Sequence, residues 1–191
     1  METLFPWPQG QVNPAKIQAE LRFQGPRELT FHFEVKCPLY LPRPFPGPQV
    51  PSQLPRSWKL WEGDVVEFFL QGRETPEDLS RPYLECQISP FSQVLSLVIL
   101  KPRQHFYTPA PFPFQVSVRK SAEGFQGNFQ VKLPEEIRGP LYYGLITASI
   151  QIAGETRHFG SEDYVKKTLK EKLDFHRPSL YVPMKHLKER A

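Results

Sequence analysis

Apolar and polar residues alternate with a period of two along most of this chain. In residues 29–37 every odd position is apolar and every even position is polar. This alternation is typical of a β-strand with one buried face. Residues 17–23 alternate in the same way before a Gly-Pro break, so residues 17–37 are predicted to form a hairpin. Six further segments of this kind follow, at 64–71, 83–89, 93–100, 114–120, 127–134 and 141–154.

Strands at short spacing with no helical pattern between them are typical of antiparallel β proteins. We therefore expect one all-β domain over residues 1–191, an antiparallel two-sheet β-sandwich of the jelly-roll or immunoglobulin-like kind. One short helix is expected near the C-terminus, because Ser161 can cap it and Val165 and Leu169 repeat at helical spacing. The 22 prolines agree with this fold class, since proline interrupts helix interiors.

Glu67 stands in the middle of the apolar strand 64–71. Successive side chains of a strand leave opposite faces, so Glu67 does not share the core face of Val66 and Phe68. The predicted core combines aromatic and aliphatic side chains from several strands: Phe31, Phe33, Val66, Phe68, Leu84, Ile88, Phe129, Val131, Ile146 and Ile150.

A hairpin between this strand and the next one brings further polar side chains beside Glu67. Tyr83, Glu85 and Gln87 are expected on the same outer face, as neighbours across the two strands. Two carboxyl groups, an amide and a phenol would thus form one patch.

Two interpretations of this patch are open. It is either an ordinary solvated face, whose acids pair with basic strand residues such as Arg119 or Lys132, or a shallow polar platform between aromatic walls formed by Trp58 and Trp61. Sugars bind to such platforms, because their C–H faces stack on aromatic rings while their hydroxyl groups bond to carboxylates and amides.

Three stretches of the chain carry a family resemblance: LWEGDVVEFFLQ, YLECQISPFSQVLSLVIL and FHRPSLYVP. They resemble small bacterial domains related to family-9 carbohydrate-binding modules. The recurring pattern of those domains is a Leu-Trp-x-x-Asp-x-Val-Glu strand, a Tyr-x-Glu-x-x-x-Ser-Pro strand and a Phe-His-x-Pro close. The resemblance covers about residues 15–183 and implies a non-catalytic domain that binds a sugar.

The same resemblance implies roles for particular residues. Trp61 would stack on a terminal sugar ring, Glu67 would accept hydrogen bonds from sugar hydroxyls, and Arg157 lies in the region of a basic hydroxyl donor. No second tryptophan follows where a sandwiching partner is expected; that region holds Tyr142, Tyr143, His158 and Phe159. Together with the patch, this defines the candidate ligand-binding residues: Trp61, Glu67, Tyr83, Glu85, Arg157 and Trp58.

Other functions are weighed against sugar binding. Residues 38–57 carry seven prolines, and the run 101–114 adds aromatics to extended backbone, so a protein–protein interaction module on the same fold is the alternative.

Carboxyl groups on neighbouring strands lie near the spacing found in retaining glycosidases. No feature of the sequence isolates one acid in an apolar pocket, however, so no enzyme is expected. His105 with Met184 would be the axial pair of a haem-binding sandwich. The histidines lack zinc-site spacing, so no metal or cofactor is expected.

The net charge of +4 is scattered along the chain, which argues against a nucleic-acid partner. No run of about 18 apolar residues and no signal-peptide pattern are present, so no membrane partner is expected. If Met1 is the native start, we expect a cytoplasmic protein whose two cysteines, Cys37 and Cys86, are buried free thiols.

Overall fold

The computed structural model describes residues 1–7, 15–25, 27–38, 40, 59–109, 114–168 and 173–184. Within these ranges the chain is mostly antiparallel β, with the helix α1 (Glu162–Thr168) and two short 3-10 turns, η1 (Leu60–Glu62) and η2 (Pro178–Leu180). The strands are β1 (Glu2–Trp7), β2 (Lys16–Gly25), β3 (Glu28–Lys36), β4 (Val65–Arg73), β5 (Tyr83–Ile88), β6 (Val94–Lys101), β7 (His105–Tyr107), β8 (Phe114–Ser121), β9 (Gly124–Lys132), β10 (Leu141–Ile152), β11 (Glu155–Gly160) and β12 (Val182–Pro183).

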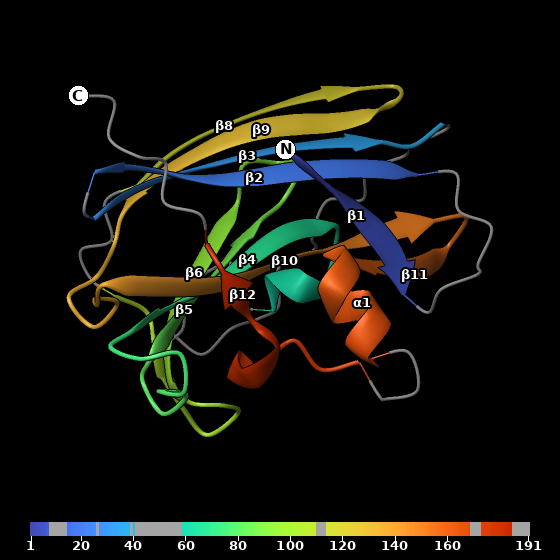
Figure 1. The fold of residues 1–191 in the computed structure, drawn as a ribbon. Helices are drawn as coiled ribbons and strands as arrows, with labels where there is room; N and C mark the ends of the chain where they lie inside the picture. Colours follow the sequence, from blue (N-terminus) through green and yellow to red (C-terminus); the bar gives the residue numbers. More distant parts are fainter. Residues whose placement is uncertain are drawn as a thin grey trace.

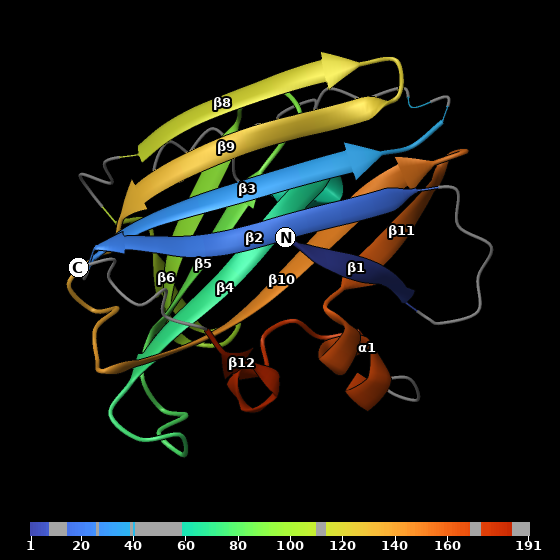
Figure 2. The ribbon, with the colours of Figure 1, turned by 45° about the horizontal axis from the view of Figure 1, so that its top comes forward.

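The described strands form one hydrogen-bonded sheet of 12 strands in the order β7-β6-β5-β4-β10-β11-β1-β2-β3-β9-β8, with β12 added to β10. The predicted antiparallel β class is confirmed, but the strands are not divided into two separate sheets. The reason is β1, whose Leu4 pairs with Ile17 of β2 and whose Phe5 pairs with Gly160 of β11. Figures 1 and 2 show β2, β3, β8 and β9 lying across β4, β5, β6 and β10 (Figure 1, Figure 2).

The main core lies between these two parts of the sheet. The ring of Phe68 on β4 lies 5.1 Å from that of Phe31 on β3 and 6.1 Å from that of Phe129 on β9, measured between ring centroids. Every residue of the predicted core is buried here. The alternation of the strands therefore identified the inner face correctly.

A second apolar layer covers the other face of β4, β5 and β10. The C-terminal segment 173–184 packs on it, and the centroids of Phe175 and Tyr181 each lie 6.1 Å from that of Phe69. On the core side of β10, a Cβ atom at Gly144 would lie 2.8 Å from Sδ of Met184 and 2.9 Å from the backbone oxygen of Phe69, so a larger residue would crowd the neighbouring strand. Figure 1 shows α1 on the side of β10 that faces away from β2 and β3, and β12 pairs with β10 within the sheet (Figure 1).

Helix α1 confirms the predicted C-terminal helix and begins directly after Ser161, but without the predicted side-chain cap. The carbonyl of Ser161 accepts a hydrogen bond from the backbone N–H of Val165 at 3.0 Å. The Ser161 hydroxyl is buried and has no hydrogen-bond partner among the described residues, so it does not cap the helix. Leu169 lies outside the described residues, and no described helix is long and apolar enough to cross a membrane.

Asp64 ties the start of β4 to the end of β10. It is 1 % exposed, and its two carboxylate oxygens accept hydrogen bonds from the Tyr40 hydroxyl at 2.5 Å and from the backbone N–H of Gln151 at 2.7 Å. A buried carboxylate is tolerated when both oxygens are bonded in this way. Asp64 thereby fixes the junction between η1, which carries Trp61, and β4, which carries Glu67.

Both cysteines are buried free thiols, as predicted. Cys37 follows β3 and Cys86 lies in β5, and both belong to the main core. Burial raises the pKa of the Cys86 thiol, which keeps it protonated and unreactive.

Candidate ligand-binding pocket

A cavity of about 380 Å³ opens on the outer face of β4, β5 and β10. This volume falls within the range of about 300 to 1,000 Å³ that is usual for small-molecule sites. The sheet contributes Glu67, Phe69, Glu85, Gln87, Leu97, Ile99, Ser149 and His158. The surrounding segments contribute Trp61, Arg103, Phe106, Phe175 and His176. We call this cavity the acidic pocket, because its two ionisable acids lie on the sheet.

The strand register brings the polar side chains of the pocket together. Glu67 on β4 is directly opposite Gln87 on β5 and, on its other side, opposite Thr147 on β10. Glu85 is opposite Phe69, so the two acids are diagonal neighbours on adjacent strands. The predicted hairpin and its shared outer face are confirmed.

The patch is not a shallow, solvated face. Glu67 is 3 % exposed and Glu85 is 4 % exposed, because the C-terminal segment and η1 cover the strands around them. Neither acid forms an ion pair with an arginine or a lysine among the described residues, and Arg119 and Lys132 lie on β8 and β9, in the other part of the sheet. The interpretation as an ordinary solvated face is therefore wrong.

Burial changes the protonation of both acids. Loss of solvation raises the pKa of Glu67 to about 8, and the nearby charge of Glu85 acts in the same direction, against hydrogen bonds from Thr147 and Gln87. Loss of solvation also raises the pKa of Glu85 to about 7, opposed by a hydrogen bond from Gln87. Near neutral pH the pair therefore holds at least one proton.

Hydrogen bonds within the protein satisfy only some of the polar atoms of Glu67, Glu85 and Gln87. The Thr147 hydroxyl donates to Oε1 of Glu67 at 3.3 Å, and Nε2 of Gln87 donates to Oε1 of Glu85 at 2.6 Å. Oε1 of Gln87 has no hydrogen-bond partner among the described residues, although Gln87 is only 1 % exposed. A buried acceptor without a donor is unfavourable, so a donor supplied by a ligand would stabilise the site.

Two histidines complete the polar side of the pocket. Nδ1 of His176 lies 2.8 Å from the Tyr83 hydroxyl and 3.9 Å from Oε2 of Glu85. Nδ1 of His158 lies 3.0 Å from the Ser149 hydroxyl. Burial lowers the pKa of both histidines below the ordinary value, so both imidazoles are neutral near pH 7.

Aromatic rings form the walls of the pocket. Trp61 on η1 and Phe106 on β7 are each 38 % exposed, and Phe175 comes from the C-terminal segment. Phe106 and Phe175 line the same pocket as Trp61, and neither was expected there from the sequence. Of the residues expected in that role, Tyr142 and Phe159 are buried in the main core.

The predicted site residues are distributed unevenly around the pocket. Trp61, Glu67 and Glu85 line it, and Tyr83 borders it through its contact with His176. Trp58 lies outside the described residues, as does most of the proline-rich stretch 38–57.

Arg157 is not brought into the pocket. It is opposite Ile150, a residue of the main core, and its guanidinium pairs with Glu155 at 2.6 Å. Its neighbour His158, opposite Ser149, lines the pocket instead. Directly opposite residues of an antiparallel pair share a face, so a shift of one residue moves the side chain to the other side.

A haem or metal site finds no support in this geometry. Among the described residues no group of three or more His, Cys, Asp or Glu side chains is placed to hold a metal ion. His105 lies on β7 and Met184 follows β12, which pairs with β10; β6, β5 and β4 lie between β7 and β10. β12 pairs with the edge of β10 opposite β4, so five strand spacings of about 4.8 Å separate β7 from β12, and this separation of about 24 Å is too large for two ligands of one iron.

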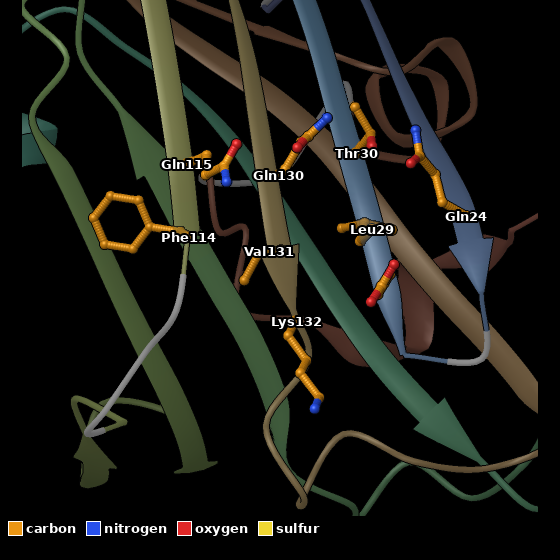
Figure 3. Close-up of a pocket in the computed structure, with 9 residues that line it drawn as sticks. Gln24, Leu29, Thr30, Phe114, Gln115, Gln130, Val131 and Lys132 are labelled. Carbon is orange, nitrogen blue, oxygen red and sulfur yellow. The ribbon is translucent and has the colours of Figure 1, made fainter.

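A second hollow, of about 330 Å³, lies over β2, β3, β8 and β9. Figure 3 shows Gln115, Gln130, Thr30 and Gln24 following one another across these strands, with Phe114 at the edge (Figure 3). No acid of this hollow is buried like Glu67, and Phe114 is 43 % exposed. The second hollow therefore serves as a comparison surface for experiments on the acidic pocket.

A comparison with known proteins found no matching family model and no similar curated protein. The function has to be inferred from the pocket itself. The acidic pocket combines buried acceptors, neutral imidazoles and aromatic walls in a cavity of ligand size. A cavity of this size with apolar walls and a few polar groups is typical of small-molecule sites.

Proposed function

We propose that this chain is a non-catalytic carbohydrate-binding domain and that its mono- or oligosaccharide ligand enters the acidic pocket. The observation that carries the proposal is the unsatisfied acceptor of Gln87 beside the carboxyl groups of Glu67 and Glu85, within a wall of aromatic rings. Sugars match both features, because their hydroxyl groups donate hydrogen bonds and their C–H faces are apolar.

Trp61 is the proposed stacking surface, and Glu67 and Gln87 are the proposed hydroxyl acceptors. A purely apolar ligand of the same size would leave the buried acceptors without donors, at a cost of about 1 to 3 kcal/mol for each one. A sugar hydroxyl placed on Gln87 removes this cost. The neutral imidazoles of His158 and His176 add groups that either donate or accept, depending on tautomer.

The proposal includes the finer features that the sequence suggested. We propose that the sheet forms a two-sheet sandwich joined through β1, which is supported by the contact between Phe31 on β3 and Phe68 on β4, whose ring centroids lie 5.1 Å apart. We place the chain with the bacterial domains related to family-9 carbohydrate-binding modules on the motif positions of Trp61 and Glu67. A cytoplasmic location is supported by the free thiols of Cys37 and Cys86, since reducing compartments keep cysteines unpaired.

The experiment is isothermal calorimetry of the purified chain against a panel of monosaccharides and disaccharides. At least one sugar is expected to bind, and Trp61→Ala is expected to abolish measurable binding. The matched control is Phe114→Ala, which removes a ring of similar exposure from the second hollow and should leave affinity unchanged. Absence of binding across the panel at millimolar concentrations, or binding that survives Trp61→Ala, would overturn the proposal.

A second candidate function is glycoside hydrolysis, which the raised pKa values of the two acids favour. A general acid needs a carboxyl group that keeps its proton near neutral pH, and burial provides this for Glu67. Hydrolysis of aryl glycosides at neutral pH, lost in both Glu67→Gln and Glu85→Gln, would establish this activity. Sugar binding without turnover would assign the pocket to recognition alone.

A further inference from the structure

Among the residues that the structure describes, no lysine or arginine forms an ion pair with either acid of the acidic pocket. Glu67 and Glu85 are diagonal neighbours on β4 and β5, a geometry that separates Cβ atoms by about 7 Å, and the charge of Glu85 acts on Glu67 at this range. Both are more than nine-tenths buried. Two buried carboxylates in this arrangement repel each other and lose solvation.

The groups that face the acids do not supply the missing charge. His158 and His176 are neutral, because burial lowers the pKa of each imidazole. Burial also raises the pKa values of the Tyr83 and Tyr181 hydroxyls, which therefore remain uncharged.

Arg103 lines the pocket, but its guanidinium lies at the mouth. Its side chain is 66 % exposed and pairs with Asp174 at 2.9 Å, so its charge is already matched by a carboxylate. Among the described residues, the interior of the pocket consequently holds two acids and no permanently charged cation.

The aromatic walls favour a cation in this place. The rings of Trp61, Phe69 and Phe106 line the same cavity as the two acids. Their negative faces attract an ammonium group that is withdrawn from water. A cation would thus meet aromatic faces on the walls and carboxylates on the sheet.

We propose, on the basis of the proposed sugar-binding function, that the pocket selects sugars carrying a primary amine, with the ammonium group held between Glu67 and Glu85 and the ring stacked on Trp61. The ammonium donates to both carboxylates and removes their repulsion. A neutral sugar makes the hydroxyl contacts but leaves one or both acids protonated. Binding of the amine therefore releases to solvent the proton that the pair holds in the free protein.

The test compares glucosamine, galactosamine and mannosamine with the parent sugar and the N-acetyl derivative of each. At about pH 7, where both the amine and part of the carboxyl pair are charged, the preferred amine should bind about 10- to 100-fold more tightly than its neutral counterparts. Calorimetry in two buffers of different ionisation enthalpy should reveal proton release for the amine and none for the parent sugar.

The variants Glu67→Gln and Glu85→Gln should each reduce this preference by about tenfold or more. The preference is measured as the ratio of the Kd for the parent sugar to the Kd for the amine, so a weaker affinity of either variant for the parent sugar does not by itself change it. Glu123→Gln, an exposed acid in the turn before β9, is the matched control and should retain the preference. At about pH 5 the wild-type preference should also fall, because the acids are protonated and the histidines begin to gain charge. The pH comparison uses the wild-type protein alone, so it does not depend on the folding of any variant.

The outcomes separate this inference from the proposed function. Equal affinity for amine and parent sugar, or a preference that survives both glutamine variants, would overturn the amine selectivity and leave sugar binding intact. A preference for the N-acetyl sugar would do the same. Failure of every sugar and amine to bind would overturn both proposals.

Discussion

The Tyr83 hydroxyl lies 2.8 Å from Nδ1 of His176, across 93 positions of sequence. This contact joins β5, in the middle of the sheet, to the C-terminal segment that covers it. His176 and Phe175 both line the acidic pocket. The segment therefore stabilises the sheet and shapes the ligand site at the same time.

Tyr83→Phe should reveal this double role. The change keeps the ring but removes the hydroxyl, so the partly buried Nδ1 of His176 loses this partner and the free energy of unfolding should fall by about 1 kcal/mol. Urea unfolding measures the loss. Tyr107→Phe is the control, because the Tyr107 hydroxyl donates to Glu136 at the surface and its removal should change stability by less than about 0.5 kcal/mol. Equal effects of the two changes would contradict the buried contact.

The stability of the wild-type protein should fall as pH rises through the neutral range. The pKa of Glu67 is about 8 in the folded chain, against 4.5 as the ordinary value. Between these values the folded state holds a proton that the unfolded state has lost, so the slope of the unfolding free energy with pH is negative. Above about pH 8 Glu67 is ionised in the folded state as well, so this group no longer makes the free energy of unfolding depend on pH. Glu85 adds to the same trend up to about pH 7.

Glu67→Gln should flatten this dependence, because an amide cannot ionise. At about pH 8 the variant should be more stable than the wild type by an amount on the order of 3 kcal/mol, and at about pH 5 the difference should be small. Urea unfolding at several pH values provides the measurement, with Glu123→Gln as the control. Parallel curves for the wild type and Glu67→Gln would show that this acid does not titrate as proposed.

Arg73→Lys should weaken the attachment of the C-terminal segment. The Arg73 guanidinium is buried, donates to the carbonyls of Pro76 at 2.7 Å and Pro178 at 2.6 Å, and stacks on Tyr143 at 4.1 Å. Lysine has no planar fork, so at least one carbonyl loses its donor and stability should fall by about 1.5 to 3 kcal/mol. Thermal unfolding tests this. Arg81→Lys, at an exposed ion pair with Glu74, is the control and should hardly change the stability. An equal loss of stability in Arg81→Lys would argue against the role of the Arg73 hydrogen bonds.

Phe68→Ala should be the most destabilising of these changes, at about 3 to 5 kcal/mol. Phe68 is fully buried between Phe31 and Phe129, where a deleted ring leaves a cavity that the sheet cannot close. Guanidinium unfolding measures the change. Leu79→Ala, at a side chain that is 42 % exposed, is the control and should change stability by less than about 0.5 kcal/mol.

The shared face of Glu67 and Gln87 could be predicted from the sequence because side chains of a strand alternate with a period of two. The burial of that face could not, because it depends on Phe175 and Tyr181, which reach Phe69 from a distant part of the chain. Local pattern carries no information on such a contact. Phe175 and His176, which line the pocket, belong to the Phe-His-x-Pro motif, but the sequence did not indicate which strand they would contact.

The sequence does contain a local reason why His158, and not Arg157, lines the pocket. Ala153 and Gly154 both have positive φ and form the tight turn between β10 and β11. A turn of this length sets the register in which Ile150 is opposite Arg157. Because Ile150 belongs to the core, this register places Arg157 on the core side and leaves His158 for the pocket.

Strand β1 constrains the order in which the strands can pair while the chain is being synthesised. Its first residues have a partner, β2, soon after they emerge from the ribosome, but Phe5 pairs with Gly160 and Trp7 with His158. The junction between the two parts of the sheet therefore closes only after most of the chain has been translated. Until then β10 lacks its β11 neighbour, and the edges of both parts stay exposed to pairing with other nascent chains.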